Sequence, residues 1–250
     1  MGVSIYDDKI SLGEAAASHV LSLIAQAIAA QGEARVIFAT GASQYEFLAA
    51  LVRRKAAVDW TKVTAFHLDE YLGLPEDHPA SFRRYLRERL FNLLPFREVN
   101  LLDGMAPNAK VEAARYAARL VTGPIDLACI GIGENGHLAF NDPPADFDTP
   151  KWVHIVTLDD ACRRQQVGEG HFPTMADVPA QALSLSIPAI LAARAVSCVA
   201  PDQRKAAAVQ CALEGPVTPI CPASALQRHP NTMLFLDRAS ASGLKHGSLT

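Results

Sequence analysis

The 250-residue sequence has few cysteines, and none of them lies in a pattern that binds a metal. Its five cysteines, Cys129, Cys162, Cys198, Cys211 and Cys221, are widely spaced and form no Cys-x-x-Cys pair or Cys/His cluster with metal-site spacing. Their odd number and scatter also argue against a disulfide framework. The sequence therefore predicts reduced thiols in a cytoplasmic protein and no metal site.

The sequence also lacks an excess of charge of one sign, because 23 Lys and Arg face 26 Asp and Glu. Basic residues occur in short groups such as Arg53-Arg54-Lys55 and Arg83-Arg84, which are typical of solvated helix faces. Without a basic stripe, we expect no nucleic-acid partner. We also expect no membrane partner, because no apolar run is expected to reach the roughly 18 to 20 residues that span a bilayer and no signal-peptide pattern opens the chain.

Half of the residues are hydrophobic, which is enough for one large core, so we predict a single domain over residues 1–250. Nearly continuous apolar runs of strand length alternate with longer segments of helical spacing. This alternation predicts an α/β fold with a doubly wound, mostly parallel, Rossmann-like sheet and helices on both faces. The small, polar residues from Ala239 onward are expected to fray. The predicted strands are Arg35–Ala39, Val63–Leu68, Ile125–Ile130, Ala195–Ala200 and Thr232–Leu236, and the predicted helices are Leu12–Ala30, Tyr45–Ala56, Pro79–Leu90, Ala109–Leu120 and Gln203–Leu213.

Ligands of such sheets bind where loops leave the carboxyl ends of the strands, and three of these loops are polar. The first, Thr40-Gly41-Ala42-Ser43, precedes a helix expected to begin near Gln44. Free amides and two hydroxyls there favour a phosphate site, although Ser43 also fits a plain N-cap. In the second, Asp69 and Glu70 end an apolar run. A carboxylate removed from water suits proton abstraction next to a carbonyl, and a capping or salt-bridged pair fits the pattern equally well.

The third loop, Gly131–Pro144, reads GIGENGHLAFNDPP and presents Asn135, His137 and Asp142 within eight residues. A histidine near a carboxylate can shuttle protons at neutral pH, and the glycine-rich setting favours catalysis over a structural histidine. The Gly-x-Gly pattern is also found in dinucleotide sites. Here it is followed by HLAFNDPP rather than by a helix and lies far from the first strand-helix unit, so we expect no nucleotide cofactor.

Together, Phe66–Leu74 and Gly131–Pro143 resemble the two signature segments of the glucosamine-6-phosphate deaminases, also called isomerases. The 6-phosphogluconolactonases share the fold but usually have Asp-Glu-Arg after the second strand. Tyr71 and Phe140–Pro143 therefore favour the deaminases. Further segments with family counterparts are His78–Phe82, Asn100–Leu102, Val178–Pro179, Ala182–Leu183, Lys205 and Leu213–Gly215.

The resemblance implies conversion of glucosamine 6-phosphate and water to fructose 6-phosphate and ammonia, without metal or cofactor. His137, with Asn135 and Asp142 nearby, would open the sugar ring, and Asp69 would move a proton from C2 to C1. The partner would be a small-molecule sugar phosphate, and a homo-oligomer is possible. An exposed helix lysine is the plain alternative for Lys205. The implied substrate and phosphate contacts are Thr40, Gly41, Ala42, Ser43, Lys205, Glu70 and Gly136.

Several positions depart from the family pattern. Asp142 stands where the family usually has glutamate, Asn135 where many members have aspartate, and Gln44 where a proline is usual. A phosphate-binding arginine is missing, because its segment is met by Gly168–Phe172. The chain also ends soon after its last predicted strand, so we expect little allosteric control. The candidate replacements for the arginine are Arg163, Arg164 and His171.

Two other functions stay open on this fold. A lactonase-type hydrolase needs no proton transfer from C2, so it would tolerate Asp69→Asn better than a deaminase. A catalytically weak sugar-phosphate sensor would bind its ligand tightly without turnover.

Overall fold

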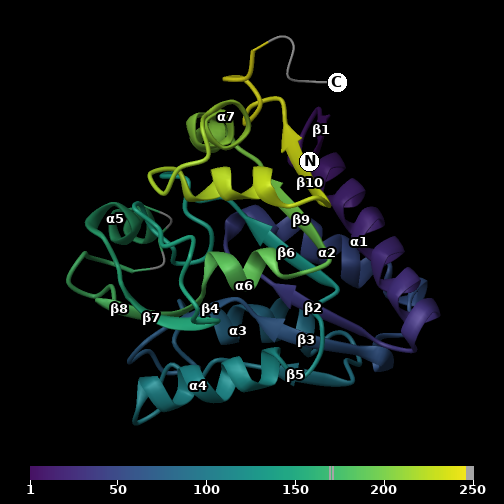
Figure 1. Cartoon of the computed structure of the whole chain (residues 1–250), viewed down its shortest axis with the longest axis horizontal. Coiled ribbons are helices and arrows are strands. Elements are labelled where there is room, and N and C mark those ends of the chain that lie inside the picture. The colour runs from purple at the N-terminus through teal and green to yellow at the C-terminus, as the bar shows by residue number, and fades with distance from the viewer. Residues whose placement is uncertain (169, 171, 246–250) are drawn as a thin grey trace.

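The computed structural model describes residues 1–168, 170 and 172–245, and within them a seven-stranded parallel sheet forms the centre of the molecule. The strand order is β1-β10-β9-β6-β2-β3-β5, and every neighbouring pair is parallel (Figure 1). The non-consecutive order confirms the predicted doubly wound α/β fold. The strands are β1 (Gly2–Tyr6), β2 (Ala34–Phe38), β3 (Val63–His67), β5 (Glu98–Asn100), β6 (Leu127–Gly131), β9 (Ala195–Ala200) and β10 (Thr232–Asp237).

Helices cover both faces of this sheet, with α4 and α6 in front and α1 and α2 behind in the view of Figure 1. Successive side chains of a strand point to opposite faces, and β2 illustrates the result. Ile37 joins the core beneath α4 and α6, whereas Val36 and Phe38 join the core beneath α1 and α2. Both faces are therefore apolar. The helices are α1 (Lys9–Gln31), α2 (Tyr45–Arg53), α3 (Phe82–Leu86), α4 (Ala109–Leu120), α5 (Asp160–Gly168), α6 (Ile187–Leu191) and α7 (Ala206–Glu214).

Helix α1 is long and apolar enough, by length and composition, to cross a membrane, which the sequence analysis did not expect. It begins at an Asp8 cap, whose carboxylate accepts from the amides of Ile10 and Ser11, and it ends at Gly32, which has a φ of 83°. Buried side chains such as Val20 and Ile24 pack into the core behind the sheet. One face of α1 therefore packs against the sheet.

A second, smaller sheet lies at one side of the first (Figure 1). It is antiparallel, with the order β4-β8-β7, and consists of β4 (Asp69–Tyr71), β7 (Val153–Thr157) and β8 (Gln181–Leu185). Only Leu68 separates β3 from β4, and its amide and carbonyl bond to Phe38 and Leu185 respectively. The chain thus passes directly from the large sheet into the small one at Asp69.

The predicted elements agree with the structure to within a few residues, with two corrections. The helix predicted over Pro79–Leu90 begins only at Phe82 and continues from Arg87 as a π-helical segment. The predicted fraying from Ala239 is wrong up to Lys245, because Ser240 is buried and donates to the carbonyl of Asp237.

Candidate active site

The three loops singled out by the sequence meet at the carboxyl edge of the parallel strands, as expected for this class of sheet. Hydrogen bonds between neighbouring strand ends, from Ala39 to Cys129 and from Leu68 to Phe38, hold the loops side by side. A fourth segment, from the end of β9, completes a cavity. Its lining residues are Ala39, Thr40, Gly41, Ala42, Ser43, Leu68, Asp69, Phe82, Gly131, Ile132, Gly133, His137, Ala139, Phe140, Gln166, Asp202, Arg204 and Lys205.

One wall of the cavity is the loop that leads from β2 to α2. Gly41 has a φ of 101°, a conformation that favours glycine, and a short 3₁₀ turn then leads into α2. The carbonyl of Gly41 accepts hydrogen bonds from the Gln44 amide at 3.0 Å and from the Tyr85 hydroxyl at 2.8 Å. Tyr85, from α3, therefore fixes a loop whose two hydroxyls and free amides suit an anion.

Gln44, where the family usually has proline, is fully buried behind this loop. Its side-chain nitrogen, Nε2, lies 3.1 Å from the Ser43 hydroxyl and 3.5 Å from the Ile130 carbonyl. A Cβ on the neighbouring Gly131 would approach both Gln44 and Ser43 to about 3 Å. Gln44 thus helps to position Ser43, and Gly131 leaves room for that contact.

Asp69 lies in the cavity with only 6% of its surface exposed. Its Oδ1 atom has no hydrogen-bond partner within the part of the chain that the structure describes. Burial, and then the negative charge of Glu70, raise the pKa of Asp69 well above its ordinary value. A buried carboxylate with a raised pKa is a stronger base than an exposed one, and the Oδ1 atom of Asp69 is available to contact a ligand.

Glu70, the adjacent acid, points away from the cavity and is fully buried. Its carboxylate accepts from the amides of Tyr71, Phe82 and Arg83, and from the Ser81 hydroxyl at 3.0 Å. The Arg83 guanidinium adds a salt bridge at 3.2 Å. Burial nevertheless raises the pKa of Glu70, against these hydrogen bonds. The predicted substrate contact is thus not seen. Glu70 instead caps the start of α3.

His137 forms the opposite wall, with its Nδ1 atom 3.2 Å from Asp142 Oδ1. Asn135 supports both residues, because its Oδ1 accepts the His137 amide at 3.1 Å and its Nδ2 donates to Asp142 Oδ1 at 3.0 Å. Burial alone would raise the pKa of Asp142, but the contacts with His137 and Asn135 outweigh burial and lower it. Asp142 is therefore an anion that contacts the imidazole despite being shorter than glutamate, although Nδ1 lacks the geometry of a hydrogen bond.

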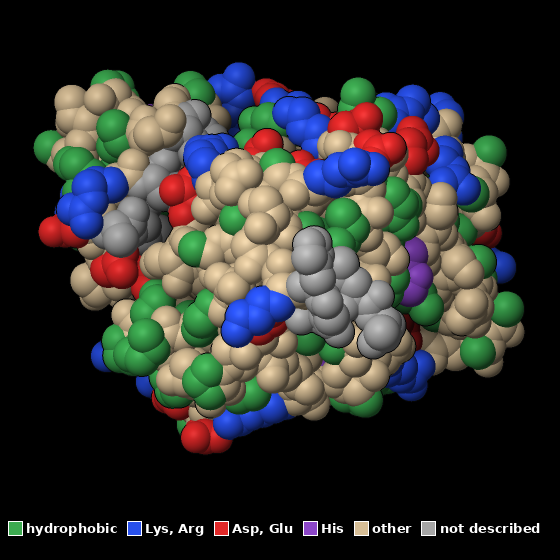
Figure 2. Space-filling model, turned by 90° about the horizontal axis from the view of Figure 1, so that it is seen from above, with side chains coloured by type: hydrophobic (Ala, Val, Ile, Leu, Met, Phe, Trp, Pro, Cys, Tyr) green, Lys and Arg blue, Asp and Glu red, His purple; other side chains and the backbone are tan. Residues whose placement is uncertain are grey.

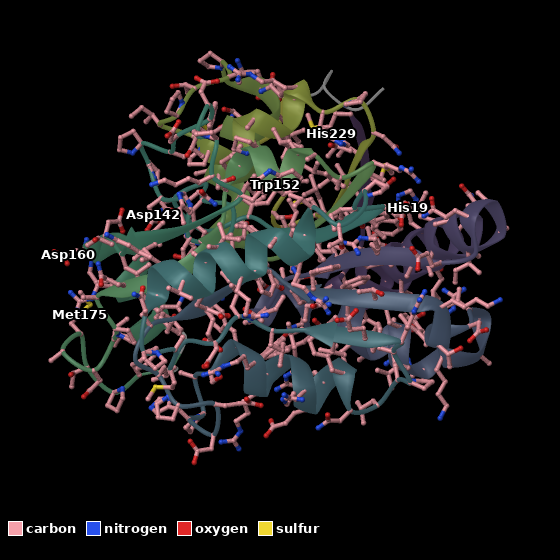
Figure 3. All side chains as sticks on the ribbon, turned by 60° about the horizontal axis from the view of Figure 1, so that its bottom comes forward. His19, Asp142, Trp152, Asp160, Met175 and His229 are labelled. Carbon is pink, nitrogen blue, oxygen red and sulfur yellow. The ribbon has the colours of Figure 1, made fainter. Side chains whose placement is uncertain are left out.

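Gly133 lies directly against the imidazole of His137. A Cβ at Gly133 would come within 2.4 Å of three ring atoms, so only glycine admits this ring position. Asp142 lies on the same side of the molecule as Asp160 of α5 and Met175, away from His19 of α1 (Figure 3). The small sheet and α5 thus flank the histidine side of the site.

The lining is completed by three charged residues from the segment that follows β9, namely Asp202, Arg204 and Lys205. Lys205 is 6% exposed and follows Asp202, whose carbonyl accepts the Lys205 amide at 2.9 Å. Arg204 lies beside it and forms a salt bridge of 3.1 Å with Glu134 of the histidine loop. The aromatic rings of Phe82 and Phe140, stacked at 5.6 Å, form an apolar side of the same cavity.

The structure brings together most, but not all, of the residues predicted for the site. Thr40, Gly41, Ala42, Ser43, Asp69, His137 and Lys205 line the cavity, and Asn135 and Asp142 lie directly behind His137. Glu70 and Gly136 do not line it. Gly136 lies instead against Cys221 and Pro222, where its φ of 84° favours glycine. The sequence analysis missed Arg204, Asp202, Gln166, Phe82 and Phe140.

None of the described candidates for the missing arginine reaches the cavity. Arg163 of α5 donates to the carbonyls of Met175 and Val178, and Arg164 is exposed. Neither is among the lining residues. His171, the third candidate, lies outside the residues that the structure describes.

Known proteins resemble this chain in sequence over most of its length. Residues 7–235 match the family model of glucosamine-6-phosphate isomerases/6-phosphogluconolactonase. The glucosamine-6-phosphate deaminase of Streptococcus sanguinis (strain SK36) is 39% identical over 87% of this chain and 90% of its own. That of Streptococcus suis (strain 05ZYH33) is 40% identical over 82% of this chain and 86% of its own.

Solved structures extend the likeness to the whole fold. A monomeric glucosamine-6-phosphate deaminase matches with a TM-score of 0.90 and 29% identity, over 98% of this chain and 100% of that chain. The 6-phosphogluconolactonase of Trypanosoma brucei matches with a TM-score of 0.82 and 20% identity over 98% of each chain, which is a likeness of fold alone. The chain belongs to the family of glucosamine-6-phosphate isomerases and 6-phosphogluconolactonases.

Proposed function

We propose that this protein is a glucosamine-6-phosphate deaminase, which converts glucosamine 6-phosphate and water to fructose 6-phosphate and ammonia. The observation that carries the proposal is the buried carboxylate of Asp69, which faces the same cavity as the loop Thr40–Ser43 and the His137–Asp142 pair. A base, an oriented histidine and an anion site are the groups that this isomerisation needs. The curated relatives with about 40% identity have the same activity in their names.

Ring opening is the first step and is assigned to His137. The imidazole accepts the proton of the C1 hydroxyl and returns a proton to the ring oxygen, which breaks the bond between C1 and that oxygen. Asp142, 3.2 Å from Nδ1, stabilises the imidazolium that forms between these two transfers. Asn135 holds both side chains in place.

Proton transfer between C2 and C1 is assigned to Asp69. Its carboxylate removes the C2 proton of the open-chain aldehyde, while the C1 oxygen takes up a proton from water, which gives an enol intermediate. Asp69 then delivers the proton that it holds to C1. The amine at C2 becomes an imine, and water replaces it to leave a ketone and ammonia. Because burial raises the pKa of Asp69, the carboxylate is a better base for a weakly acidic C–H group.

The phosphate is assigned to the loop Thr40–Ser43 and to Lys205. The hydroxyls of Thr40 and Ser43 and the amides at the start of the helical segment supply hydrogen bonds, and the Lys205 ammonium supplies a point charge. This end of the substrate takes no part in the bond changes. It therefore positions C1 and C2 between Asp69 and His137.

The proposal is tested by incubating the purified protein with glucosamine 6-phosphate, galactosamine 6-phosphate and 6-phosphogluconolactone in parallel. We expect equimolar ammonia and fructose 6-phosphate from the first substrate, with a bell-shaped pH profile of kcat/KM. Its acidic limb should rise as Asp69 loses its proton, since only the carboxylate is a base. Lactone hydrolysis without ammonia release would establish a lactonase instead, and tight binding of all three without turnover would establish a sensor.

A further inference from the structure

A sugar phosphate brings more negative charge into this cavity than Lys205 alone offsets. A phosphate monoester has a charge of about −1.5 to −2 at pH 7. Lys205 supplies one positive charge, and Asp202 in the same lining supplies a negative one. The family's phosphate-binding arginine is missing, and neither Arg163 nor Arg164 lines the cavity. A second cation beside the cavity would therefore strengthen phosphate binding.

Arg204 lies where a second phosphate-binding cation could act. Among the described residues, it is the one arginine that lines the cavity, and it directly precedes Lys205. Its side chain is 50% exposed, so it can change its direction without disturbing a packed core. A guanidinium also binds phosphate oxygens in a bidentate geometry that an ammonium cannot reproduce.

The backbone around Arg204 is fixed, although its side chain is not. The Asp202 backbone amide donates to Asp237 Oδ2 at 3.0 Å, and the side-chain Nε2 atom of Gln203 donates to the Ser242 hydroxyl at 2.9 Å. These bonds join the turn to the end of β10 and to the segment that follows it. The turn that carries Arg204 is therefore held in place beside the cavity.

The guanidinium is held by Glu134, at 3.1 Å. Glu134 is 35% exposed and belongs to the loop that precedes His137. An exposed pair of this kind contributes little to stability, so a dianion can replace the carboxylate as the partner of Arg204. Glu134 and the phosphate would then compete for one guanidinium.

We propose that Arg204 is the second phosphate-binding cation of this site, in place of the family's arginine, and that Glu134 holds it in the ligand-free protein. The inference rests on the proposed function only in that the ligand is a sugar phosphate. It predicts opposite effects for the two partners of the salt bridge. Removal of Arg204 weakens binding, whereas neutralisation of Glu134 strengthens it.

The test is isothermal titration of the full-length protein with fructose 6-phosphate and with inorganic phosphate, which requires no turnover. Arg204→Ala is expected to weaken both by about tenfold to a hundredfold, as for a lost charge-assisted hydrogen bond. Glu134→Gln is expected to strengthen both by about twofold to fivefold. In the Arg204→Ala background, Glu134→Gln should have no effect, because the guanidinium for which Glu134 and the phosphate compete is gone.

Arg53→Ala is the matched control, because Arg53 forms an equally exposed salt bridge with Glu14 away from the cavity. It should leave both affinities unchanged. Affinities of Arg204→Ala within twofold of the wild-type values would overturn the inference, as would an effect of Glu134→Gln that persists without Arg204. If the intact protein binds both ligands but fails to release ammonia from glucosamine 6-phosphate, only the proposed function is lost.

Discussion

Gly133 shows how a single atom decides the position of a functional side chain. The imidazole of His137 occupies the space that a Cβ at Gly133 would fill. We expect Gly133→Ala to displace the ring and to lower kcat by about a hundredfold, the usual contribution of a misplaced general acid or base.

Gly123→Ala is the control for this prediction, because a Cβ there makes only ordinary contacts with the Arg35 side chain at 3.5 Å or more. Steady-state kinetics of the two variants are the measurement. If Gly133→Ala retained the wild-type kcat, the proposed role of the His137 position would be wrong.

Asp69 illustrates the conflict between stability and function. Because its pKa is raised in the folded protein, the folded state holds the Asp69 proton more tightly than the unfolded state does. Ionisation of Asp69 therefore costs stability, and the cost appears as the pH rises above the ordinary value of 3.8. We expect Asp69→Asn to raise the free energy of unfolding at pH 7 by about 0.5 to 2 kcal/mol.

The measurement is denaturant unfolding of the wild type and of Asp69→Asn between pH 3.5 and pH 8. The difference should be small at the acidic end, where the wild-type carboxyl is mostly protonated in both states, and should grow with pH. A variant that is less stable than the wild type at pH 7 would contradict the raised pKa.

The family resemblance assigned proton transfer to Asp69 and a substrate contact to Glu70, but the residue pattern alone could not separate these two acids. Both acids end the same apolar run, and successive residues of a strand point to opposite sides. Which of them faces the cavity depends on where α3 begins, since the amides and side chains of Ser81–Arg83 bind Glu70. Those partners lie more than ten residues away in the sequence.

The loop from β2 to α2 depends on α3, an element that the sequence analysis did not connect with it. The Tyr85 hydroxyl donates to the Gly41 carbonyl at 2.8 Å. We expect Tyr85→Phe to raise KM for the sugar phosphate by about twofold to tenfold, with kcat almost unchanged, because a neutral hydrogen bond that positions the anion loop is lost.

Tyr45→Phe is the matched control, because Tyr45 stacks on Tyr85 at 5.6 Å and does not line the cavity. Its KM should stay at the wild-type value. A loss of kcat in Tyr85→Phe with KM unchanged would show that the tyrosine acts on the chemical step rather than on the loop.

Five strands of the large sheet were predictable because their apolar runs are continuous, whereas its two edge strands, β1 and β5, and the small sheet were not predicted. Strand β4 has only three residues and follows β3 after a single residue, so the two merge into one run in the sequence. Strand β8 pairs with β4 on one side and with β7 on the other, and β4 lies far from both in the sequence. Short antiparallel strands of this kind carry little local signal.

The whole molecule should lose stability in acid through His67, which ends β3 in the core. Burial, and then the positive charge of Arg83, lower the pKa of His67 from 6.5 to about 3. Below pH 6.5 the unfolded chain therefore binds a proton that the folded chain excludes. The stability contributed by the neutral imidazole is present above pH 6.5 and is lost as the pH falls towards 3, at up to about 1.4 kcal/mol per pH unit.

The corresponding measurement is the free energy of unfolding of the wild type and of His67→Gln between pH 4 and pH 8. We expect the variant to have the smaller slope below pH 6.5 and a constant offset above it. Parallel curves over the whole range would show that His67 does not titrate between the two states.

The surface fits a compact enzyme with a recessed site. On the face shown in Figure 2, Lys and Arg side chains are interspersed with Asp and Glu. The fold class and the carboxyl-edge location followed from the order of strands and helices alone. The fourth segment of the site, Asp202–Lys205, was harder to predict from the sequence. Only the pairing of β9 with β6 brings this segment beside the histidine loop.

The central claim is that Asp69 moves the proton between C2 and C1, and its most direct test is turnover of glucosamine 6-phosphate by Asp69→Asn at pH 7. The account predicts a folded variant that still binds fructose 6-phosphate and has a kcat about a hundredfold to ten-thousandfold below that of the wild type. A folded variant that releases ammonia and fructose 6-phosphate at close to the wild-type rate would contradict it.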